Sequence, residues 1–169
     1  MRKQIIAPLA AGVLLALAGA AQAATKTASF TVSATVSKNC FITAGALTFL
    51  EAFEGDNDLD QTSNISVRCT LDVPYEISLS AGGSGDHASR RMTGPGGDLL
   101  FYNLYTTDLH AAVWGDGSPG TVTVGDEGEG MGIPNTIVHT VHGRVLASDN
   151  AGPIGTGAYS DTIVATITY

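Results

Sequence analysis

Basic residues are scarce in this sequence: 8 lysines and arginines stand against 16 aspartates and glutamates, which gives a formal net charge of −8. A protein that binds nucleic acid by neutralising phosphates needs the opposite balance, so this class of partner is not expected. Charged residues make up only 14% of the 169 residues, while 44% are hydrophobic. Because an intrinsically disordered chain is typically rich in charge and poor in apolar residues, we expect one folded domain.

The main hydrophobic run is too short to span a membrane. Residues 5–20 are apolar, follow two basic residues, and end in the small-x-small sequence of residues 21–23. These are the three parts of a secretory signal peptide, so residues 1–23 are predicted to be removed on export. The alternative is a membrane anchor, which needs about 20 apolar residues. We expect the mature chain to be exported to the cell surface or the extracellular space, without a transmembrane span.

Cysteine is limited to two residues, Cys40 and Cys69. Two cysteines cannot complete a structural zinc site, and no histidine is near either of them in the sequence. In an oxidising compartment a pair of thiols can close. We therefore expect a Cys40–Cys69 disulfide, with a catalytic thiol or a metal ligand as the alternatives.

Helical periodicity is almost absent after the signal peptide, whereas alternation of apolar and polar residues recurs. Residues Phe30–Val36 alternate apolar with hydroxyl side chains, which is typical of a strand with one buried face. Glycine- and proline-rich clusters separate the apolar stretches and predict turns. This pattern predicts an all-β fold, an antiparallel β-sandwich. Further strands are expected at Ala46–Phe53, Asn64–Thr70, Val73–Ser80, Leu99–Tyr105, Ala111–Trp114, Thr121–Val124, Ile137–Leu146 and Tyr159–Tyr169.

The two terminal strands of the mature chain differ from the others. The last one runs to the final residue and has one alternating apolar row, made of Ile163, Ala165, Ile167 and Tyr169. The first segment, residues 24–37, begins at the expected cleavage site and is rich in threonine and serine. The pattern alone leaves open whether both are ordinary strands of a closed sandwich.

Several motifs together resemble one known family. The chain resembles the spore coat protein U domain family, the subunits of archaic, Csu-type chaperone/usher pili, over essentially the whole mature sequence. The Tyr-Asn-Leu-Tyr and Trp-Gly-Asp-Gly signatures of that family have counterparts here. The matching stretches are Phe30–Val36 leading to Cys40, Ile65–Thr70, Leu100–Tyr105, Val113–Gly117, Gly143–Val145 and Gly157–Thr162.

The resemblance implies an incomplete immunoglobulin-like sandwich that lacks one strand. In such families a periplasmic chaperone first fills the gap, and at an outer-membrane usher the N-terminal segment of the next subunit replaces it, a form of strand addition. It implies a donor segment at residues 24–37 and a sandwich at residues 38–169. The polymer of identical or related copies would support adhesion or biofilm formation. The donor side chains would be Phe30, Val32, Ala34 and Val36, and the groove would lie along Ile163, Ala165, Ile167 and Tyr169.

Residues capable of catalysis or metal binding do not form a recognisable motif. On the predicted strand His139 and His142 are three apart and so point to opposite faces. Asp56, Asp58 and Asp60 resemble the start of a calcium loop, but Gln61 replaces its glycine and the closing glutamate is missing. We therefore expect no enzyme activity, no catalytic residues, no metal and no cofactor. Two alternatives remain: a secreted coat or matrix protein of the same fold, and a monomeric secreted sandwich that binds a ligand.

Overall fold

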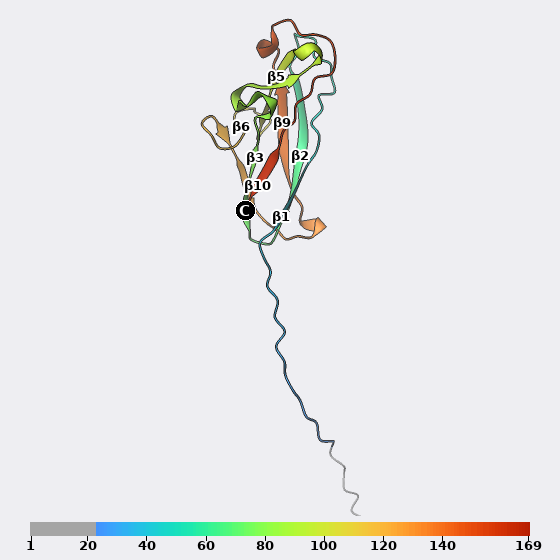
Figure 1. Ribbon diagram of the computed structural model, residues 1–169, viewed down its shortest axis with the longest axis vertical. Helices are drawn as coiled ribbons and strands as arrows, with labels where there is room; N and C mark the ends of the chain where they lie inside the picture. The colour runs from blue at the N-terminus through green and yellow to red at the C-terminus, as the bar shows by residue number, and fades with distance from the viewer. Residues whose placement is uncertain (1–22) are drawn as a thin grey trace, which may run out of the picture. The chain divides into compact units, whose positions relative to one another are not determined.

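The computed structural model describes residues 23–169, so the predicted signal peptide lies outside the described residues except for its last position. Within this range the protein is all-β, with strands and short 3-10 turns but no α-helix (Figure 1). The residues up to Thr35 and those from Val36 onward form separate units. The strands are β1 (Cys40–Ala44), β2 (Leu59–Cys69), β3 (Pro74–Leu79), β4 (Arg90–Thr93), β5 (Leu99–Tyr105), β6 (Val113–Trp114), β7 (Thr121–Val122), β8 (Val124–Glu127), β9 (Ile137–Val145) and β10 (Ala165–Thr168). The turns are η1 (Gly82–Ser84), η2 (His87–Ser89), η3 (Pro95–Gly97), η4 (Ile133–Asn135) and η5 (Ala147–Asn150).

The strands form two sheets. The larger sheet has the order β1-β2-β9-β5-β6-β7, with β4 also paired to β5, and the smaller sheet has the order β10-β3-β8. The pairings are antiparallel except for β6 and β7, which are parallel. This architecture confirms the predicted β-sandwich, and the β6–β7 pair is a local departure from the wholly antiparallel arrangement expected.

The core lies between the sheets and is built from alternate residues of their strands. Val67 and Val145 of the larger sheet and Ile77 of the smaller sheet are fully buried. Burying each such side chain stabilises the fold by about 1.5 to 3 kcal/mol. Trp114 is also fully buried, and its indole N–H donates to the carbonyl of Ile77 over 3.0 Å. This hydrogen bond joins the larger sheet to the smaller one.

Three expected strands with a partner on each side were predicted closely, whereas the expected Asn64–Thr70 covers only the second part of β2. The ranges Val73–Ser80, Leu99–Tyr105 and Ile137–Leu146 match β3, β5 and β9 within one residue at each end. The strand expected at Ala46–Phe53 is wrong, because this stretch has no strand, and of Tyr159–Tyr169 only β10 is a strand. In residues 46–53 and 159–164 the apolar alternation reflects side chains that face the interior, while no neighbouring strand completes a hydrogen-bonded ladder.

The expected disulfide is present between Cys40 and Cys69. It joins the first residue of β1 to the last residue of β2, which are register partners in the sheet. No cysteine in residues 23–169 is left free. The bond therefore fixes the edge strand β1 to the sheet where the chain enters the sandwich.

Removing the disulfide is expected to destabilise the domain substantially. The bond closes a loop with a sequence separation of 29, and a loop of this size restricts the unfolded chain by about 3 to 4 kcal/mol. We expect the Cys40→Ala, Cys69→Ala double variant to lose that much unfolding free energy in urea denaturation. Equal denaturation midpoints for the variant and the oxidised parent would contradict this expectation.

Candidate functional site: an open cleft beside a free sheet edge

A cleft of about 970 Å³ opens the core to the surface. The core side chains at its base include Leu59, Ile65, Leu79, Leu100 and Leu104. Its rim is formed by further apolar side chains that pack against the core but stay partly exposed. These rim residues are Leu47, Phe49, Phe53, Met92, Ile154, Tyr159, Ile163 and Ala165.

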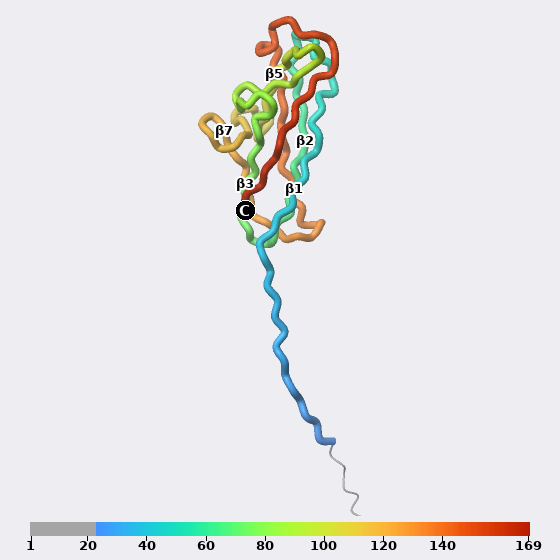
Figure 2. Tube along the Cα trace, viewed as in Figure 1, coloured from blue at the N-terminus to red at the C-terminus, as the bar shows by residue number. Residues whose placement is uncertain are grey.

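The cleft exists because two long segments beside it form almost no sheet. Residues 45–58 connect β1 to β2 without a strand, and residues 151–164 lead into β10 with one isolated bridge, between Ser160 and Thr93. Figure 2 shows this second segment running along the sandwich toward the C-terminus. In the first segment Leu47 and Phe49 are half-buried, whereas Thr48 is exposed. Apolar side chains of both segments therefore face the core, but neither segment forms a strand that would complete the sheet over it.

One border of the cleft is a free sheet edge. Strand β10 pairs with β3 on one side and ends the smaller sheet on the other. In an antiparallel pair, alternate residues of an edge strand turn their backbone N–H and C=O groups away from the partner. Ile163, Ala165 and Ile167 face the core and are only half-buried. Tyr169, expected in the same row, follows the end of β10 and is 51% exposed.

The Asp161 carboxylate holds the residues just before β10 in place. Asp161 accepts a hydrogen bond from the Tyr102 hydroxyl at 2.8 Å and another from the Gly83 amide at 2.9 Å. Burial, together with the hydrogen bond to Asp161, raises the pKa of Tyr102, so this phenol remains a neutral donor. Gly82 has φ +65°, and a Cβ at this position would overlap the Asp161 carboxylate. These contacts hold the segment before β10 against η1, so the position of the cleft border is fixed.

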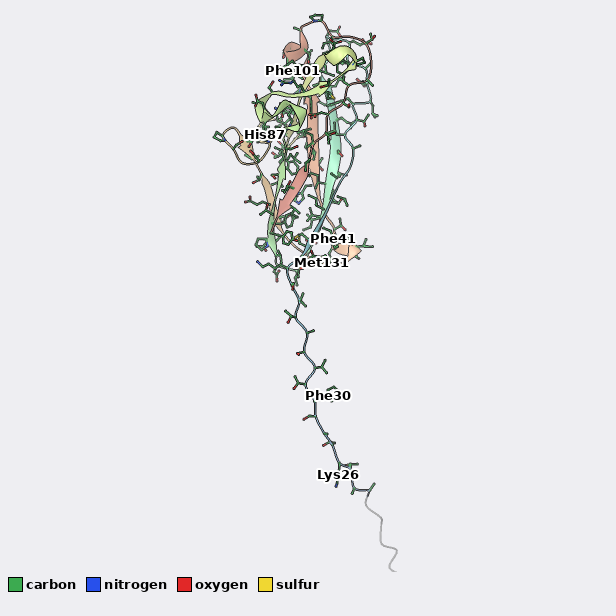
Figure 3. The ribbon with its side chains drawn as sticks, viewed as in Figure 1. Lys26, Phe30, Phe41, His87, Phe101 and Met131 are labelled. Atoms are coloured by element: carbon green, nitrogen blue, oxygen red, sulfur yellow. A yellow bond between two sulfur atoms is a disulfide. The ribbon has the colours of Figure 1, made fainter. Side chains whose placement is uncertain are left out.

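The predicted donor segment carries apolar side chains with nothing packed on them. Phe30 and Val32 are 87% and 83% exposed, Ala34 is exposed, and no strand is assigned between residues 24 and 37 (Figure 3). The strand expected from Phe30–Val36 is thus absent, since no backbone partner for it is present among residues 23–169. An alternating row of exposed apolar residues is unusual in a soluble protein and indicates an interaction site.

The end of this segment is anchored where the sandwich begins. The Thr70 hydroxyl donates to the Ser37 carbonyl over 3.3 Å and accepts from the Asn39 amide over 3.1 Å. The Thr70 amide in turn donates to the Asn39 carbonyl. Next to these bonds the Cys40–Cys69 disulfide ties the chain to β2. Hydrogen bonds and the disulfide therefore hold residues 37–40 to β2, and the predicted donor segment is joined to the sandwich at this place.

The polar residues singled out in the sequence do not converge on one site. His139 accepts or donates a hydrogen bond with the Tyr75 hydroxyl at 2.8 Å, and burial lowers the pKa of this histidine. His87 contacts the Leu79 carbonyl, and His110 lies 3.3 Å from Asp60. Within residues 23–169 no group of three or more histidine, cysteine, aspartate or glutamate side chains is arranged to hold a metal.

The acidic loop contacts a cation of the protein itself. Asp58 and Asp60 both form ion pairs with Arg144 of β9, at 3.1 and 3.4 Å, and Asp58 also accepts from the Ala147 amide. Asp58 and Asp60, which resemble the start of a calcium loop in the sequence, therefore contact an arginine side chain in the structure.

Among the described residues, no helix is long and apolar enough to cross a membrane.

The groove row expected along the last strand lies only partly at the cleft: Ile163 and Ala165 line it, whereas Ile167 and Tyr169 do not. On the other side of the cleft, Leu47 and Phe49 were expected only as part of an ordinary strand. Met92, on the unpredicted strand β4, was not expected at all. The signal available for Leu47 and Phe49 is their alternation, which indicates inward-facing side chains but not a strand partner.

Comparison with known proteins agrees with this geometry. The family model of the Spore Coat Protein U domain matches residues 26–166. Protein U of Myxococcus xanthus is 34% identical, over 99% of this chain and 98% of its own length. A similar fold occurs in the CsuC–CsuE chaperone–tip adhesion subunit pre-assembly complex from the archaic chaperone-usher Csu pili of Acinetobacter baumannii, with a TM-score of 0.58 and 20% identity over 80% of this chain and 40% of that chain. The chain therefore belongs to the Spore Coat Protein U domain family.

Proposed function

We propose that the protein is a structural subunit of a surface pilus that polymerises by donor-strand complementation. Residues 24–37 of one copy enter the cleft of a neighbouring copy and pair with the free edge of β10. Phe30, Val32, Ala34 and Val36 then cover the half-open core. The role is structural and not catalytic.

The observation that carries this proposal is that cleft and segment are complementary. The cleft combines half-buried apolar side chains with unpaired backbone groups along β10, which is what an added strand satisfies. The segment offers an alternating apolar row with hydroxyl residues between, and it has no partner of its own among the described residues. Residues 30–36 extend over about 20 Å as a strand, which the cleft border from Tyr159 to Thr168 accommodates.

The size of the contact is adequate for a polymer. Burying Phe30, Val32 and Val36 contributes about 5 to 9 kcal/mol, to which backbone hydrogen bonds add about 0.5 to 1.5 kcal/mol each. Ordering the segment offsets part of this gain. Extraction of a whole strand is slow, so the fibre is also stabilised kinetically.

The proposal also covers the route of assembly. An open apolar cleft promotes aggregation, so a periplasmic chaperone fills it before polymerisation at an outer-membrane usher. The solved structure with a similar fold is a complex of a chaperone with a pilus subunit. This likeness supports a chaperone as a partner of this chain. Export by the predicted signal peptide and final location at the cell surface are parts of this proposal, as is a role in adhesion or biofilm formation.

A second candidate is a component of a spore coat or matrix. The family description names spore coat, and the match covers residues 26–166. Assembly would use the same cleft and the same donor segment. The two candidates differ in where the polymer lies, which immunogold labelling of intact cells distinguishes.

The proposal is tested by removing the donor and supplying it as a peptide. We expect the chain lacking residues 24–37 to form no polymer and to bind a synthetic peptide of those residues. Saturating peptide should raise its melting temperature by about 10 °C or more, because a ligand of the folded state stabilises it by mass action. The matched control is the same peptide with Phe30 and Val32 replaced by aspartate. A monomeric full-length chain whose melting temperature does not change on deletion or on peptide addition would refute donor-strand complementation and favour a self-contained ligand-binding sandwich.

A further inference from the structure

The charges of the chain are divided unequally between the predicted donor segment and the sandwich. Residues 24–39 contain two lysines, Lys26 and Lys38, and no acidic residue. Residues 40–169 contain four arginines against all 16 acidic residues, which gives this part a formal net charge of −12. Lys26 is labelled in Figure 3, and Lys38 stands two residues after Val36. The two lysines therefore flank the alternating apolar row of the donor segment.

The charged residues that line the cleft are all acidic. They are Glu51, Glu54 and Asp161, and among the described residues no lysine or arginine lines the cleft. Asp161 already accepts hydrogen bonds from Tyr102 and Gly83. Glu51 and Glu54 are exposed, and neither side chain forms an ion pair within the part of the chain that the structure describes. These two carboxylates can therefore pair with a cation that arrives with the donor.

The two glutamates lie toward the end of the cleft where β2 begins. A Cβ on Gly143 would meet the Leu47 side chain, and Gly143 pairs with Gln61 near the start of β2. Glu51 and Glu54 follow Leu47 in the segment that leads into β2. Strand β10 ends toward the other end of the sandwich, because its last residue pairs near the start of β3, which follows the end of β2. The two carboxylates therefore lie beside the segment that precedes β10.

A short link limits how far Lys38 can be from the cleft that its own donor segment enters. Once Val36 is inserted into a neighbouring copy, only three residues separate it from Cys40. Extended residues span at most about 3.3 to 3.6 Å each. Hydrogen bonds to Thr70 and the disulfide hold the residues on both sides of Lys38 to the sandwich. Lys38 is therefore confined to the mouth of the neighbour's cleft.

We propose that Lys38 of one copy pairs with Glu51 and Glu54 on the cleft rim of its neighbour and so sets the direction in which the donor is inserted. This inference rests on the donor-strand complementation proposed above. It places Val36 toward the start of β2 and Phe30 on the side of β10, so the donor runs opposite to β10. An antiparallel pair is also the more stable arrangement per residue. Because the ion pair is exposed to solvent at the rim, it acts on the rate and direction of insertion more than on the final affinity.

The test is a charge swap in the purified mature chain, with the initial rate of fibre growth measured by light scattering. We expect Lys38→Glu to slow growth by about tenfold at about 20 mM salt, because it replaces an attraction at the rim by a repulsion. The double variant Glu51→Lys, Glu54→Lys should be slowed in the same way. Combining all three substitutions in one chain, or mixing the two slow variants, should restore growth to within about threefold of the parent. At about 500 mM salt the rates should converge, because exposed charges are then screened.

Two matched controls separate this contact from an effect of net charge. Lys26→Glu makes the same change at the other end of the donor segment, and it should not be rescued by Glu51→Lys, Glu54→Lys. The double variant Glu127→Lys, Glu129→Lys makes the same change on exposed carboxylates outside the cleft, and it should not rescue Lys38→Glu.

Three results would overturn the proposal while leaving donor-strand complementation intact. The first is rescue of Lys26→Glu by the swapped rim, which would indicate the opposite direction of insertion. The second is equal rescue of Lys38→Glu by both pairs of swapped carboxylates, which would reduce the effect to net charge. The third is equal growth of the parent and all variants at low salt. A parent chain that forms no fibre would instead refute the proposed function, and this inference with it.

Discussion

Phe30→Asp is expected to abolish fibre formation while the subunit still folds and still binds its chaperone. The Phe30 side chain is 87% exposed in the isolated chain, so the substitution removes no contact within the subunit. In the polymer it removes the burial of a large apolar side chain, which contributes about 1.5 to 3 kcal/mol. It also brings a carboxylate into an apolar cleft, at a cost of several kcal/mol. Together these terms lower the affinity of the donor by more than about a thousandfold.

The matched control for this prediction is the next residue. Thr31→Asp introduces the same charge one position along, on the face of the donor that alternation turns toward solvent. We expect Thr31→Asp to give normal fibres by negative-stain electron microscopy and Phe30→Asp to give none. Under the proposed assembly route a chaperone fills the subunit's own cleft, so pull-down with that chaperone is expected to be equal for both variants. Fibres of normal length from Phe30→Asp would show that Phe30 is not an anchor.

Arg90→Met is expected to lower the stability of the domain by about 4 kcal/mol or more. Arg90 is fully buried and donates to three acceptors: the carbonyls of Ser80 and Trp114, and the Asn103 side chain, at 2.8 to 3.1 Å. No carboxylate lies within ion-pair distance of it among the described residues. Methionine keeps much of the volume but leaves the Ser80 and Trp114 carbonyls without this donor, whereas the Asn103 oxygen still accepts from the Leu104 amide. Each unpaired buried group costs about 1 to 3 kcal/mol. A loss of this size is a large share of the total stability of a domain.

The neighbouring arginine provides the control for this variant. Arg91 is half-buried on the same strand, β4, and its side chain makes no hydrogen bond or ion pair within residues 23–169. We expect Arg91→Met to change the unfolding free energy by no more than about 0.5 kcal/mol. The measurement is urea denaturation of both variants in the presence of donor peptide. Similar midpoints for the two variants would contradict the assigned role of Arg90.

The sequence predicted the paired strands of the sandwich because burial and pairing coincide there. In β3 and β9 the alternating apolar residues face the core, and strands on both sides supply hydrogen bonds, so the pattern and the ladder agree. The disulfide was also predictable, since an exported chain with Cys40 and Cys69 alone has one pairing available. These predictions depend only on the local residue pattern and on the oxidising compartment expected for an exported chain.

The cleft was harder to predict because its walls show the same alternation as true strands. Leu47 and Phe49 alternate as strand residues do, and so do Ile163 and Ala165, yet their pattern reports only which side chains face inward. Whether a neighbouring strand is present depends on the rest of the chain. The alternating residues are the same whether or not a partner strand is present, so the pattern cannot show that a partner is missing.

The polar contacts were the least predictable part. Arg90 lies in the sequence Ser-Arg-Arg-Met, which suggests an exposed turn, and nothing local distinguishes Arg90 from Arg91. Its burial follows from acceptors at Ser80 just after β3, on β5 and on β6, which only the folded structure brings together.

The central claim is that the N-terminal segment of one subunit completes the sandwich of the next. The most direct measurement is a cryo-electron microscopy map of fibres assembled from the mature chain, at a resolution that separates strands. We predict density for residues 30–36 beside β10 of the neighbouring subunit, with Phe30 and Val32 directed into the cleft between Leu47 and Ile163. A map in which each cleft is empty, or is filled by a segment of its own subunit, would contradict the claim.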